Sequence, residues 1–208
     1  MFVVFEGIDG AGKTTQAKLL TQRLQADGIK AEQVFDPGTT KVGQAIRKIL
    51  LETDEPMTVM AQMLLFSAAR AELAEHIAAR ISAGVLVVCD RWLLSTLVYQ
   101  GEINGVPPDL ILSIFRGTSP VTPDVCVLLD LDPESAAVRM GAPRDRYERR
   151  SLADRRRMRA AYHKYAAQEN LGGELFMLDA TTPIDDTHDR VYQHVRFVFD
   201  AKRAATSI

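Results

Sequence analysis

The chain has 208 residues, of which 47% are hydrophobic and 25% are charged. These proportions are typical of a globular domain and argue against a disordered or membrane class. The formal net charge of -2 at pH 7 gives no overall attraction to nucleic acid or to an acidic membrane surface, so an anionic ligand needs a local site. We therefore expect one domain spanning residues 1–208, with no nucleic-acid partner and no membrane partner.

The two cysteines indicate a reducing environment. Cys89 and Cys126 lie in separate apolar runs and lack the spacing of metal ligands, which predicts buried free thiols and a cytoplasmic protein. The opening segment MFVVFEG has no basic region, and no stretch approaches the roughly 18 apolar residues of a membrane span. We expect no targeting segment.

Short β-branched runs alternate with longer segments of helical period along the chain. The predicted strands are Phe2–Phe5, Ala31–Phe35, Val85–Cys89, Val125–Leu131 and Leu175–Leu178. The predicted helices are Lys13–Ala26, Thr40–Leu51, Met57–Ser82, Pro133–Met140, Leu152–Gln168 and Ile184–Phe199. Candidate loops are Gly101–Pro108 and Met140–Arg150. The alternation predicts an α/β fold, with a five-stranded parallel sheet covered by helices on both faces and ligands at the carboxyl ends of the strands.

The first predicted strand is followed by a phosphate-binding motif. The segment Gly7–Thr14 fits G-x-x-x-x-G-K-[ST] and stands between a strand and a helix, which is the context this motif needs. Its glycines allow backbone N–H groups to face inward, Lys13 can reach the terminal phosphates, and the Thr14 hydroxyl can bind Mg²⁺. This predicts a three-layer P-loop NTPase sandwich with an ATP site formed by Gly7, Ile8, Asp9, Gly10, Ala11, Gly12, Lys13, Thr14 and Thr15. The alternative is a glycine-rich turn with a surface lysine and no role in binding.

A P-loop alone fits a nucleotide switch, a motor or a kinase. The later strands are not followed by an Asn-Lys-x-Asp segment that reads guanine, which disfavours the switch. The residues that choose between these classes lie elsewhere in the chain.

Two further patterns suggest an acceptor site. Phe66 and Arg70 are four apart on one helix face, where a ring can stack on a base and a guanidinium can bond its edge. Ordinary core packing with a snorkelling arginine is the alternative. Asp90 and Arg91 follow the strand Val85–Cys89, which brings a carboxylate near the P-loop to hold Mg²⁺ directly or through water. A surface ion pair is the alternative here.

Taken together, these residues resemble the thymidylate kinase family of P-loop nucleoside monophosphate kinases. Each motif beyond the P-loop is weak alone, but their shared order and spacing cover nearly the whole chain. The motifs are GIDGAGKTT at Gly7–Thr15, Asp36-Pro37-Gly38-Thr39, Gly43-x-x-Ile46-Arg47, Leu65-Phe66-Ser67-Ala68-Ala69-Arg70, Asp90-Arg91 with Ser95-Thr96 and Tyr99-Gln100-Gly101, Pro123-Asp124 with Leu129-Asp130 and Pro133-Glu134, Asp145-Arg146-x-Glu148, and Leu178-Asp179-Ala180.

The resemblance implies a homodimeric enzyme that uses ATP and Mg²⁺ to convert dTMP to dTDP for dTTP synthesis. It implies that Asp9 bonds the sugar 3′-hydroxyl, that Arg47 and Arg91 hold the acceptor phosphate, and that Phe66 stacks on thymine. Arg70 would bond O4 of the base. Positions near the base are Thr96 and Gln100, and Tyr99 crowds the 2′ carbon. The expected substrate-binding set is Asp9, Asp36, Arg47, Phe66, Arg70, Arg91, Ser95, Thr96, Tyr99 and Gln100. The expected metal-binding set is Thr14 and Asp90.

An arginine-rich segment at about residues 139–150 resembles the lid of this family. A kinase must exclude water, and a lid that carries arginine into the closed site also supplies charge. Gly10 stands where some members have an arginine, so the charge should come from the lid. We expect the catalytic set to be Lys13, Asp9, Arg91 and Arg144. Further lid contacts to ATP would come from Arg139 and Arg146, and the stretch from Arg149 onward is expected to be a solvated helix face.

One departure leaves the base open. Many bacterial members have an arginine where this chain has Phe35, so a 5-substituted deoxyuridylate or another deoxynucleotide remains an alternative acceptor. A P-loop switch or binding module without kinase activity is the alternative of another class. The helix Met57–Leu73 is apolar around most of its circumference, which fits the family's homodimer or a buried core helix in a monomer.

Overall fold

Five parallel strands form one sheet in the order β2-β3-β1-β4-β5, as the alternating pattern predicts. The computed structural model describes residues 1–53, 55–119, 121–142, 147, 149–168 and 173–206. The strands are β1 (Phe2–Glu6), β2 (Ala31–Phe35), β3 (Leu86–Asp90), β4 (Val125–Asp130) and β5 (Glu174–Asp179). The helices are α1 (Lys13–Ala26), α2 (Lys41–Glu52), α3 (Val59–Ser82), α4 (Leu93–Thr96), η1 (Leu97–Ile103), α5 (Pro108–Thr118), α6 (Pro133–Met140), α7 (Leu152–Ala166) and α8 (Ile184–Thr206).

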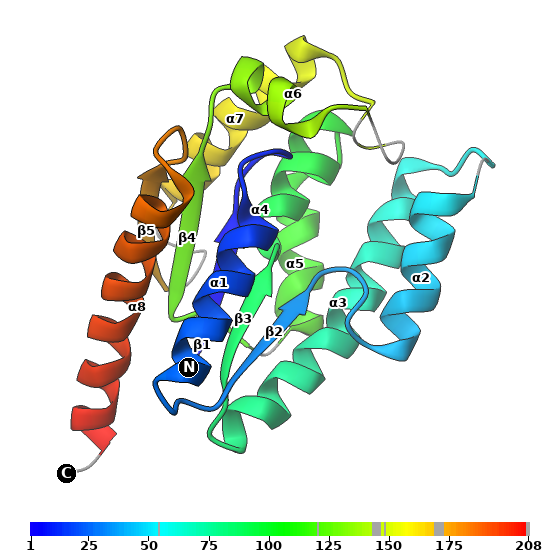
Figure 1. The fold of residues 1–208 in the computed structure, drawn as a ribbon. Coiled ribbons are helices and arrows are strands. Elements are labelled where there is room, and N and C mark those ends of the chain that lie inside the picture. Colours follow the sequence, from blue (N-terminus) through cyan, green and yellow to red (C-terminus); the bar gives the residue numbers. More distant parts are fainter. Residues whose placement is uncertain (54, 120, 143–146, 148, 169–172, 207–208) are drawn as a thin grey trace.

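Helices cover both faces of this sheet. Figure 1 shows α1 and α8 on one face and α3 and α5 on the other, with α2 packed against α3 at the side. The central strands β1 and β3 are buried along their whole length, which explains why their sequences are continuous apolar runs rather than alternating ones. The expected α/β sandwich is therefore confirmed.

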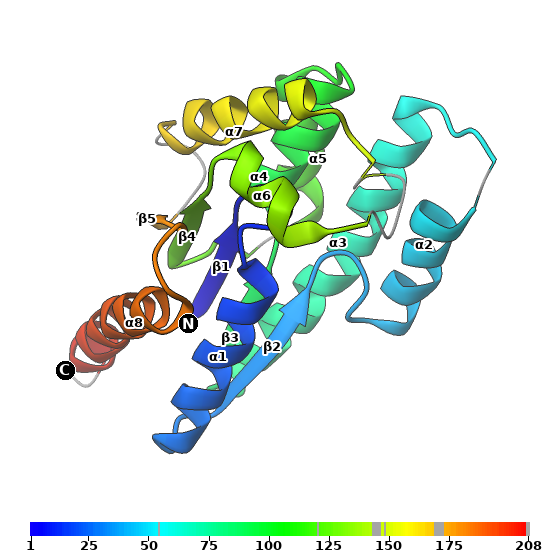
Figure 2. The same cartoon turned by 45° about the horizontal axis from the view of Figure 1, so that its top comes forward.

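The loops that carry the predicted site meet at one edge of the sheet. Because all strands are parallel, the segments after β1, β2 and β3 all leave from the same end (Figure 1). Figure 2 turns this edge forward and shows α6 beside the start of α1. The fold thus brings the P-loop, the loop after Phe35 and the Asp90–Arg91 turn together.

The segment between β3 and β4 contains more helix than the sequence pattern predicted. The expected loop Gly101–Pro108 is wrong in part, because Gly101 lies within the π-helix η1 and Pro108 begins α5. Proline is favoured at the first position of a helix, where its missing N–H has no partner to lose. Within the described residues, no helix is both long and apolar enough to cross a membrane.

Candidate active site

The P-loop wraps around the amine of a buried lysine. The Nζ atom of Lys13 donates a hydrogen bond to the carbonyl oxygen of Ile8 at 2.8 Å, and the side chain is almost fully buried. Burial and the nearby charge of Arg91 together lower the pKa of Lys13 to about 8, although Asp9, Asp90 and Glu6 oppose the shift. The amine is therefore held at the N-terminus of α1, where backbone N–H groups also favour an anion.

Helix α6 explains why the P-loop has no side chain at Gly10. This residue has a left-handed backbone with φ of 87°, and a Cβ atom there would lie 2.7 Å from the carbonyl oxygen of Ala136 and 3.1 Å from Cγ of Met140. Any side chain would therefore collide with the α6 backbone. An arginine is excluded at this position for the same reason.

Thr14 and Asp90, the two predicted metal ligands, lie in contact. The Thr14 hydroxyl donates to Oδ2 of Asp90 at 2.5 Å. The other carboxylate oxygen, Oδ1, is buried and has no hydrogen-bond partner in the described part of the chain. Among the described residues no cluster of three or more His, Cys, Asp and Glu side chains could hold a metal. A cation here would therefore need oxygens from water and from bound phosphates, as Mg²⁺ commonly does.

Asp9, Arg91 and Tyr99 form the junction between the P-loop and the expected acceptor side. Arg91 forms an ion pair with Oδ1 of Asp9, and the Tyr99 hydroxyl donates to Oδ2 at 2.6 Å. Burial alone would raise the pKa of Asp9, but the charges of Arg91 and Lys13 and the Tyr99 hydrogen bond together lower it to about 2. Asp9 is therefore an anion held between two cations and a phenol.

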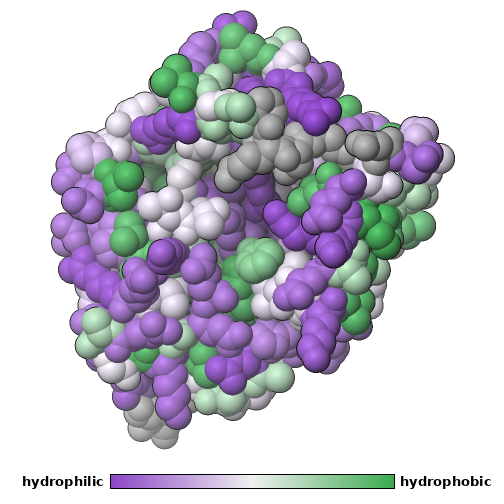
Figure 3. Space-filling model, turned by 45° about the vertical axis from the view of Figure 1, so that its right-hand side comes forward, coloured by the Kyte–Doolittle hydropathy of each residue, from purple (hydrophilic) through white to green (hydrophobic). Residues whose placement is uncertain are grey.

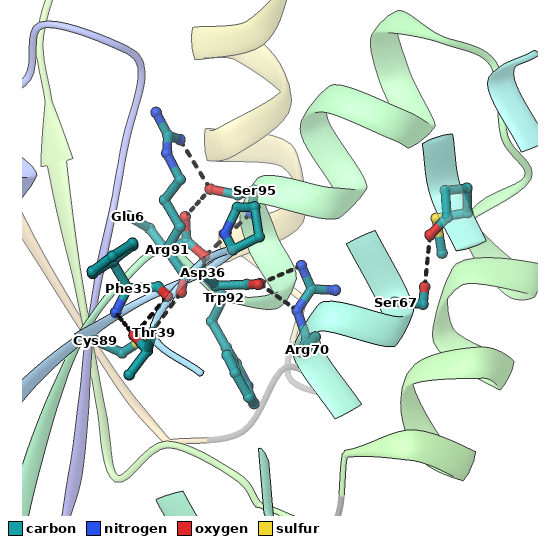
Figure 4. Close-up of polar contacts among 12 residues, drawn as sticks. Glu6, Phe35, Asp36, Thr39, Ser67, Arg70, Cys89, Arg91, Trp92 and Ser95 are labelled. Atoms are coloured by element: carbon teal, nitrogen blue, oxygen red, sulfur yellow. Dashed lines mark hydrogen bonds and ion pairs between the residues drawn. The ribbon is translucent and has the colours of Figure 1, made fainter. Parts of the chain in front are cut away.

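The position of Arg91 depends on Glu6, a residue that the sequence interpretation did not single out. The carboxylate of Glu6 is buried and accepts hydrogen bonds from the backbone N–H of Trp92 at 2.8 Å and of Ser95 at 3.2 Å. It also accepts one from the Ser95 hydroxyl at 2.6 Å, and Nη1 of Arg91 donates to that hydroxyl at 3.1 Å (Figure 4). The only sign in the sequence is a charged residue that ends an apolar strand.

The backbone of Arg91 is itself strained. Its φ of 75° lies in the left-handed region that non-glycine residues rarely adopt. The Arg91 N–H donates to the carbonyl oxygen of Phe5 at 3.0 Å, and Trp92 is held by Glu6 on the other side. These bonds to β1 keep the turn in a conformation that points the guanidinium at Asp9.

Arg70 is buried and paired with Asp36 rather than extended toward the surface. Its Nε and Nη2 atoms each lie 2.7 Å from Oδ2 of Asp36 (Figure 4), and the guanidinium carbon lies 5.7 Å from the centre of the Trp92 ring. Burial raises the pKa of Asp36, although the charge of Arg70 opposes this shift. The alternative of a snorkelling arginine is wrong.

Phe66 lies one turn of α3 before Arg70. Its ring meets that of Tyr147 edge to face, with 5.8 Å between the centroids, and the Tyr147 hydroxyl donates to Oε1 of Gln62 at 3.1 Å. The described end of the expected lid therefore contacts the helix that carries the expected base-binding residues.

Phe35 and Arg47 lie together at the outer side of the site. Nη1 of Arg47 donates to the carbonyl oxygen of Pro37 at 2.9 Å, and its guanidinium carbon lies 5.7 Å from the centre of the Phe35 ring. The Phe35 side chain is 42% exposed. The ring therefore lies beside the Arg47 guanidinium. The surface is hollowed on this face of the molecule, and most of the residues around the hollow are hydrophilic (Figure 3).

The remaining expected residues fall into three groups. Thr96 and Gln100 are buried, and Nε2 of Gln100 has no hydrogen-bond partner among the described residues. Thr15 and Arg139 are exposed. Two expected lid arginines, Arg144 and Arg146, lie outside the described residues.

The expectation of a solvated helix face from Arg149 onward is wrong in part. Arg155 is only 9% exposed, and its Nη1 atom lies 2.9 Å from Sδ of Met140. Arg150 is half-buried, with its guanidinium carbon 5.6 Å from the centre of the Tyr99 ring. Arg156 is exposed and pairs with Glu134, as a solvated face predicts. The helical period shows which residues share a face, but not which face the rest of the fold covers.

Comparison with known proteins agrees with the resemblance seen in the sequence. The family model for thymidylate kinase matches residues 5–191. A thymidylate kinase of Pelodictyon phaeoclathratiforme is 38% identical over 204 residues, and one of Chlorobaculum parvum is 37% identical over 204 residues. Each alignment covers 92% of this chain and 93% of the relative. A thymidylate kinase of Halothermothrix orenii is 34% identical over 203 residues, covering 94% of this chain and 96% of the relative. The chain therefore belongs to the thymidylate kinase family.

Proposed function

We propose that this protein transfers the γ-phosphoryl group of ATP to dTMP, giving dTDP and ADP, as a step of dTTP synthesis. The observation that carries the proposal is the Asp9–Arg91–Tyr99 cluster, which lies directly beside the Lys13 cradle and so joins a donor site to an acceptor site. Membership of the thymidylate kinase family supports the same reaction and favours dTMP over the 5-substituted deoxyuridylate that Phe35 left open.

The reaction needs little acid–base chemistry. An oxygen of the acceptor phosphate forms a bond to the γ-phosphorus, and the bond from that phosphorus to the β–γ bridging oxygen breaks. The acceptor oxygen is already anionic and the electron pair leaves with ADP, so positioning and charge neutralisation carry the rate. Lys13 would hold the donor phosphates and Arg91, with Arg47, the acceptor phosphate.

The ATP site would be formed by Gly7–Thr15, and a lid at about residues 139–150 would close over it. We assign Arg144 to the transferring phosphoryl group, with Arg139 and Arg146 as further ATP contacts, all within a single domain of residues 1–208. A side chain at Gly10 would collide with α6, which supports the lid, rather than the P-loop, as the element that supplies the arginine.

Mg²⁺ fits the site beside Thr14 and Asp90. The unpartnered Oδ1 of Asp90 and the adjacent hydroxyl form a donor set of hard oxygens, which is the chemistry this ion prefers. When bound, Mg²⁺ would supply positive charge that neutralises the donor phosphates. Thr14 and Asp90 would hold it directly or through water.

The base would lie against Phe66, with Arg70 bonding its edge and Thr96 and Gln100 nearby. Asp36 would act on the base through Arg70, whose guanidinium engages its Oδ2 atom. Asp9 would accept a hydrogen bond from the sugar 3′-hydroxyl. The nearby Tyr99 ring would favour a deoxyribose. Ser95 would act through Arg91, to which its hydroxyl is bonded.

The protein would function in the cytoplasm as a homodimer. Val59, Met60 and Leu64 on α3 are large apolar side chains that are exposed in the single chain. Figure 3 shows hydrophobic residues on the α2 and α3 side of the molecule. Both cysteines are free and buried, which supports a reducing compartment. Light scattering on purified protein tests the dimer, and a Leu64→Glu variant should be monomeric.

The reaction is tested by following ADP formation with MgATP and each nucleoside monophosphate in turn. The proposal expects ADP release that depends on dTMP and falls by several orders of magnitude in Lys13→Ala. Equal ADP release with and without every monophosphate would mean that the protein is an ATPase, switch or binding module instead.

A further inference from the structure

The Tyr99 ring lies close to two guanidinium groups, of which only Arg91 has been assigned a role above. The guanidinium carbon of Arg91 is 5.2 Å from the ring centre, and that of Arg150 is 5.6 Å from it. Arg91 is neutralised by Asp9, which also accepts the Tyr99 hydroxyl. Arg150 thus brings a second positive charge to the acceptor side, from a position just before α7.

Arg150 is held at this place by aromatic rings rather than by an anion. Its guanidinium carbon also lies 5.8 Å from the centre of the Tyr147 ring. In the part of the chain that the structure describes, Arg150 has no carboxylate partner, and its buried Nε atom has no hydrogen-bond acceptor. A buried N–H without an acceptor is costly, and a guanidinium bound only by rings keeps its forked donors available.

We propose that Arg150 binds the phosphate group of the monophosphate acceptor, as a further member of the substrate site. The inference rests on the proposed function, since it assigns the charge to the acceptor that Arg91 would also hold. Two guanidinium groups near the same ring could both donate to one phosphate, and together they would bind it more strongly than either alone. The rings of Tyr99 and Tyr147 hold Arg150 ready for this contact, which lowers the entropy lost on binding.

A phosphate ligand fits Arg150 better than a base or a sugar does. Guanidinium donors match phosphate oxygens in geometry and charge, whereas the edge of the base already has Arg70 as its expected donor. The opposing interpretation is structural: Arg150 would only clamp the Tyr147 segment against η1 by cation–π contact. The two interpretations differ in whether the phosphate group of the ligand matters.

The test compares dTMP with thymidine, which lacks the phosphate, by calorimetric titration of the full chain and of an Arg150→Ala variant. We expect the variant to bind dTMP about 10- to 100-fold more weakly while its affinity for thymidine changes less than about twofold. Arg150→Lys keeps the charge but not the planar fork, so its loss should be intermediate. Arg156→Ala, which removes an exposed arginine paired with Glu134, is the matched control and should change neither affinity.

The outcomes separate the two proposals. If the unaltered protein releases ADP with dTMP but Arg150→Ala binds dTMP normally, Arg150 has no phosphate role and the proposed reaction stands. If the variant loses dTMP and thymidine affinity equally, Arg150 is structural. If the unaltered protein neither binds nor phosphorylates dTMP, the proposed function is wrong, and the role of Arg150 that rests on it is wrong as well. Thermal melting of Arg150→Ala and Arg150→Gln checks that a loss of binding is not a loss of fold.

Discussion

Arg70 and Asp36 form a buried ion pair, in which two nitrogens of the guanidinium approach the same carboxylate oxygen at 2.7 Å. Asp36 follows the edge strand β2 and Arg70 lies in α3, so the pair ties a loop to a helix 34 residues away in sequence. The guanidinium is therefore held in one orientation by the protein itself. A donor held in place by the protein loses little freedom on binding.

Arg70→Met should lower both stability and base recognition. Removing the arginine leaves the Asp36 carboxylate buried without its partner, which costs on the order of 3–5 kcal/mol of the free energy of unfolding. In a chain of this length that corresponds to a fall in Tm of roughly 10 °C. Calorimetric melting and steady-state kinetics with several pyrimidine monophosphates measure the two effects.

The matched control is Arg70→Met combined with Asp36→Leu. This double variant removes both charges, so Tm should return close to that of the unaltered protein while discrimination among pyrimidines stays low. If the double variant regained base discrimination, Arg70 would have no direct contact with the base. An unchanged Tm in the single variant would mean that the pair contributes little to stability.

The pKa of Lys13 predicts how ATP binding depends on pH. Burial and the charge of Arg91 lower this pKa to about 8, so the amine is charged below that pH and neutral above it. Because kcat/KM reports on the free enzyme, its value for ATP should fall as the pH rises through about 8. Bound phosphates favour the charged amine, so kcat at saturating ATP should stay level to a higher pH.

Initial rates across the alkaline range check this prediction, with Lys18→Ala as the control. Lys18 is an exposed lysine of the same helix, and its loss should leave the pH profile unchanged. A kcat/KM for ATP that stayed level well above pH 8 would show that the Lys13 amine remains charged in the free protein.

The sheet and the P-loop were predictable because their patterns are local. The buried strands are uninterrupted apolar runs, and Gly7–Thr14 follows one of them directly. The π-helix η1 between β3 and β4 was missed for a physical reason. In η1 the hydrogen bonds skip one residue more than in an α-helix, so its side chains do not follow the period of 3.6. Only packing against α7 reveals it.

The candidate site was predictable as a set of residues but not as a set of contacts. Phe66 and Arg70 were identified by spacing and resemblance, whereas the partner of Arg70 depends on where β2 ends in space. Glu6 and Arg150 were missed because one is a single charge at the end of a strand and the other is one of many arginines. Their roles arise from contacts between residues far apart in the sequence, which no local pattern reveals.

Asp90→Asn should raise the requirement for Mg²⁺. The change removes the negative charge but keeps the shape of the side chain, so the fold should be retained while the free Mg²⁺ needed for half-maximal rate rises about 10- to 100-fold. Thr14→Ser keeps a hydroxyl beside Asp90 and should behave almost like the unaltered protein. Titration of free Mg²⁺ at constant ATP measures the effect, and an unchanged half-maximal concentration in Asp90→Asn would remove Asp90 from the metal site.

Glu6 should position Arg91 through geometry rather than through charge. Its carboxylate accepts hydrogen bonds from two backbone N–H groups and from the Ser95 hydroxyl, and burial raises its pKa. Glu6→Gln keeps an oxygen for the N–H groups and can donate to Ser95, so the turn at Arg91 should survive with a change in kcat of less than about tenfold. Glu6→Ala leaves two buried N–H groups without acceptors, which costs on the order of 3–5 kcal/mol of stability.

The effect on catalysis separates this positioning role from a general loss of fold. In Glu6→Ala, measured below its reduced Tm, the strained turn at Arg91 should relax and the KM for dTMP should rise by about tenfold or more, while the KM for ATP changes little. A merely structural residue would affect both substrates alike. If Glu6→Gln were as damaging as Glu6→Ala, the negative charge of Glu6 would be what holds Arg91, because the amide preserves the geometry and removes only the charge.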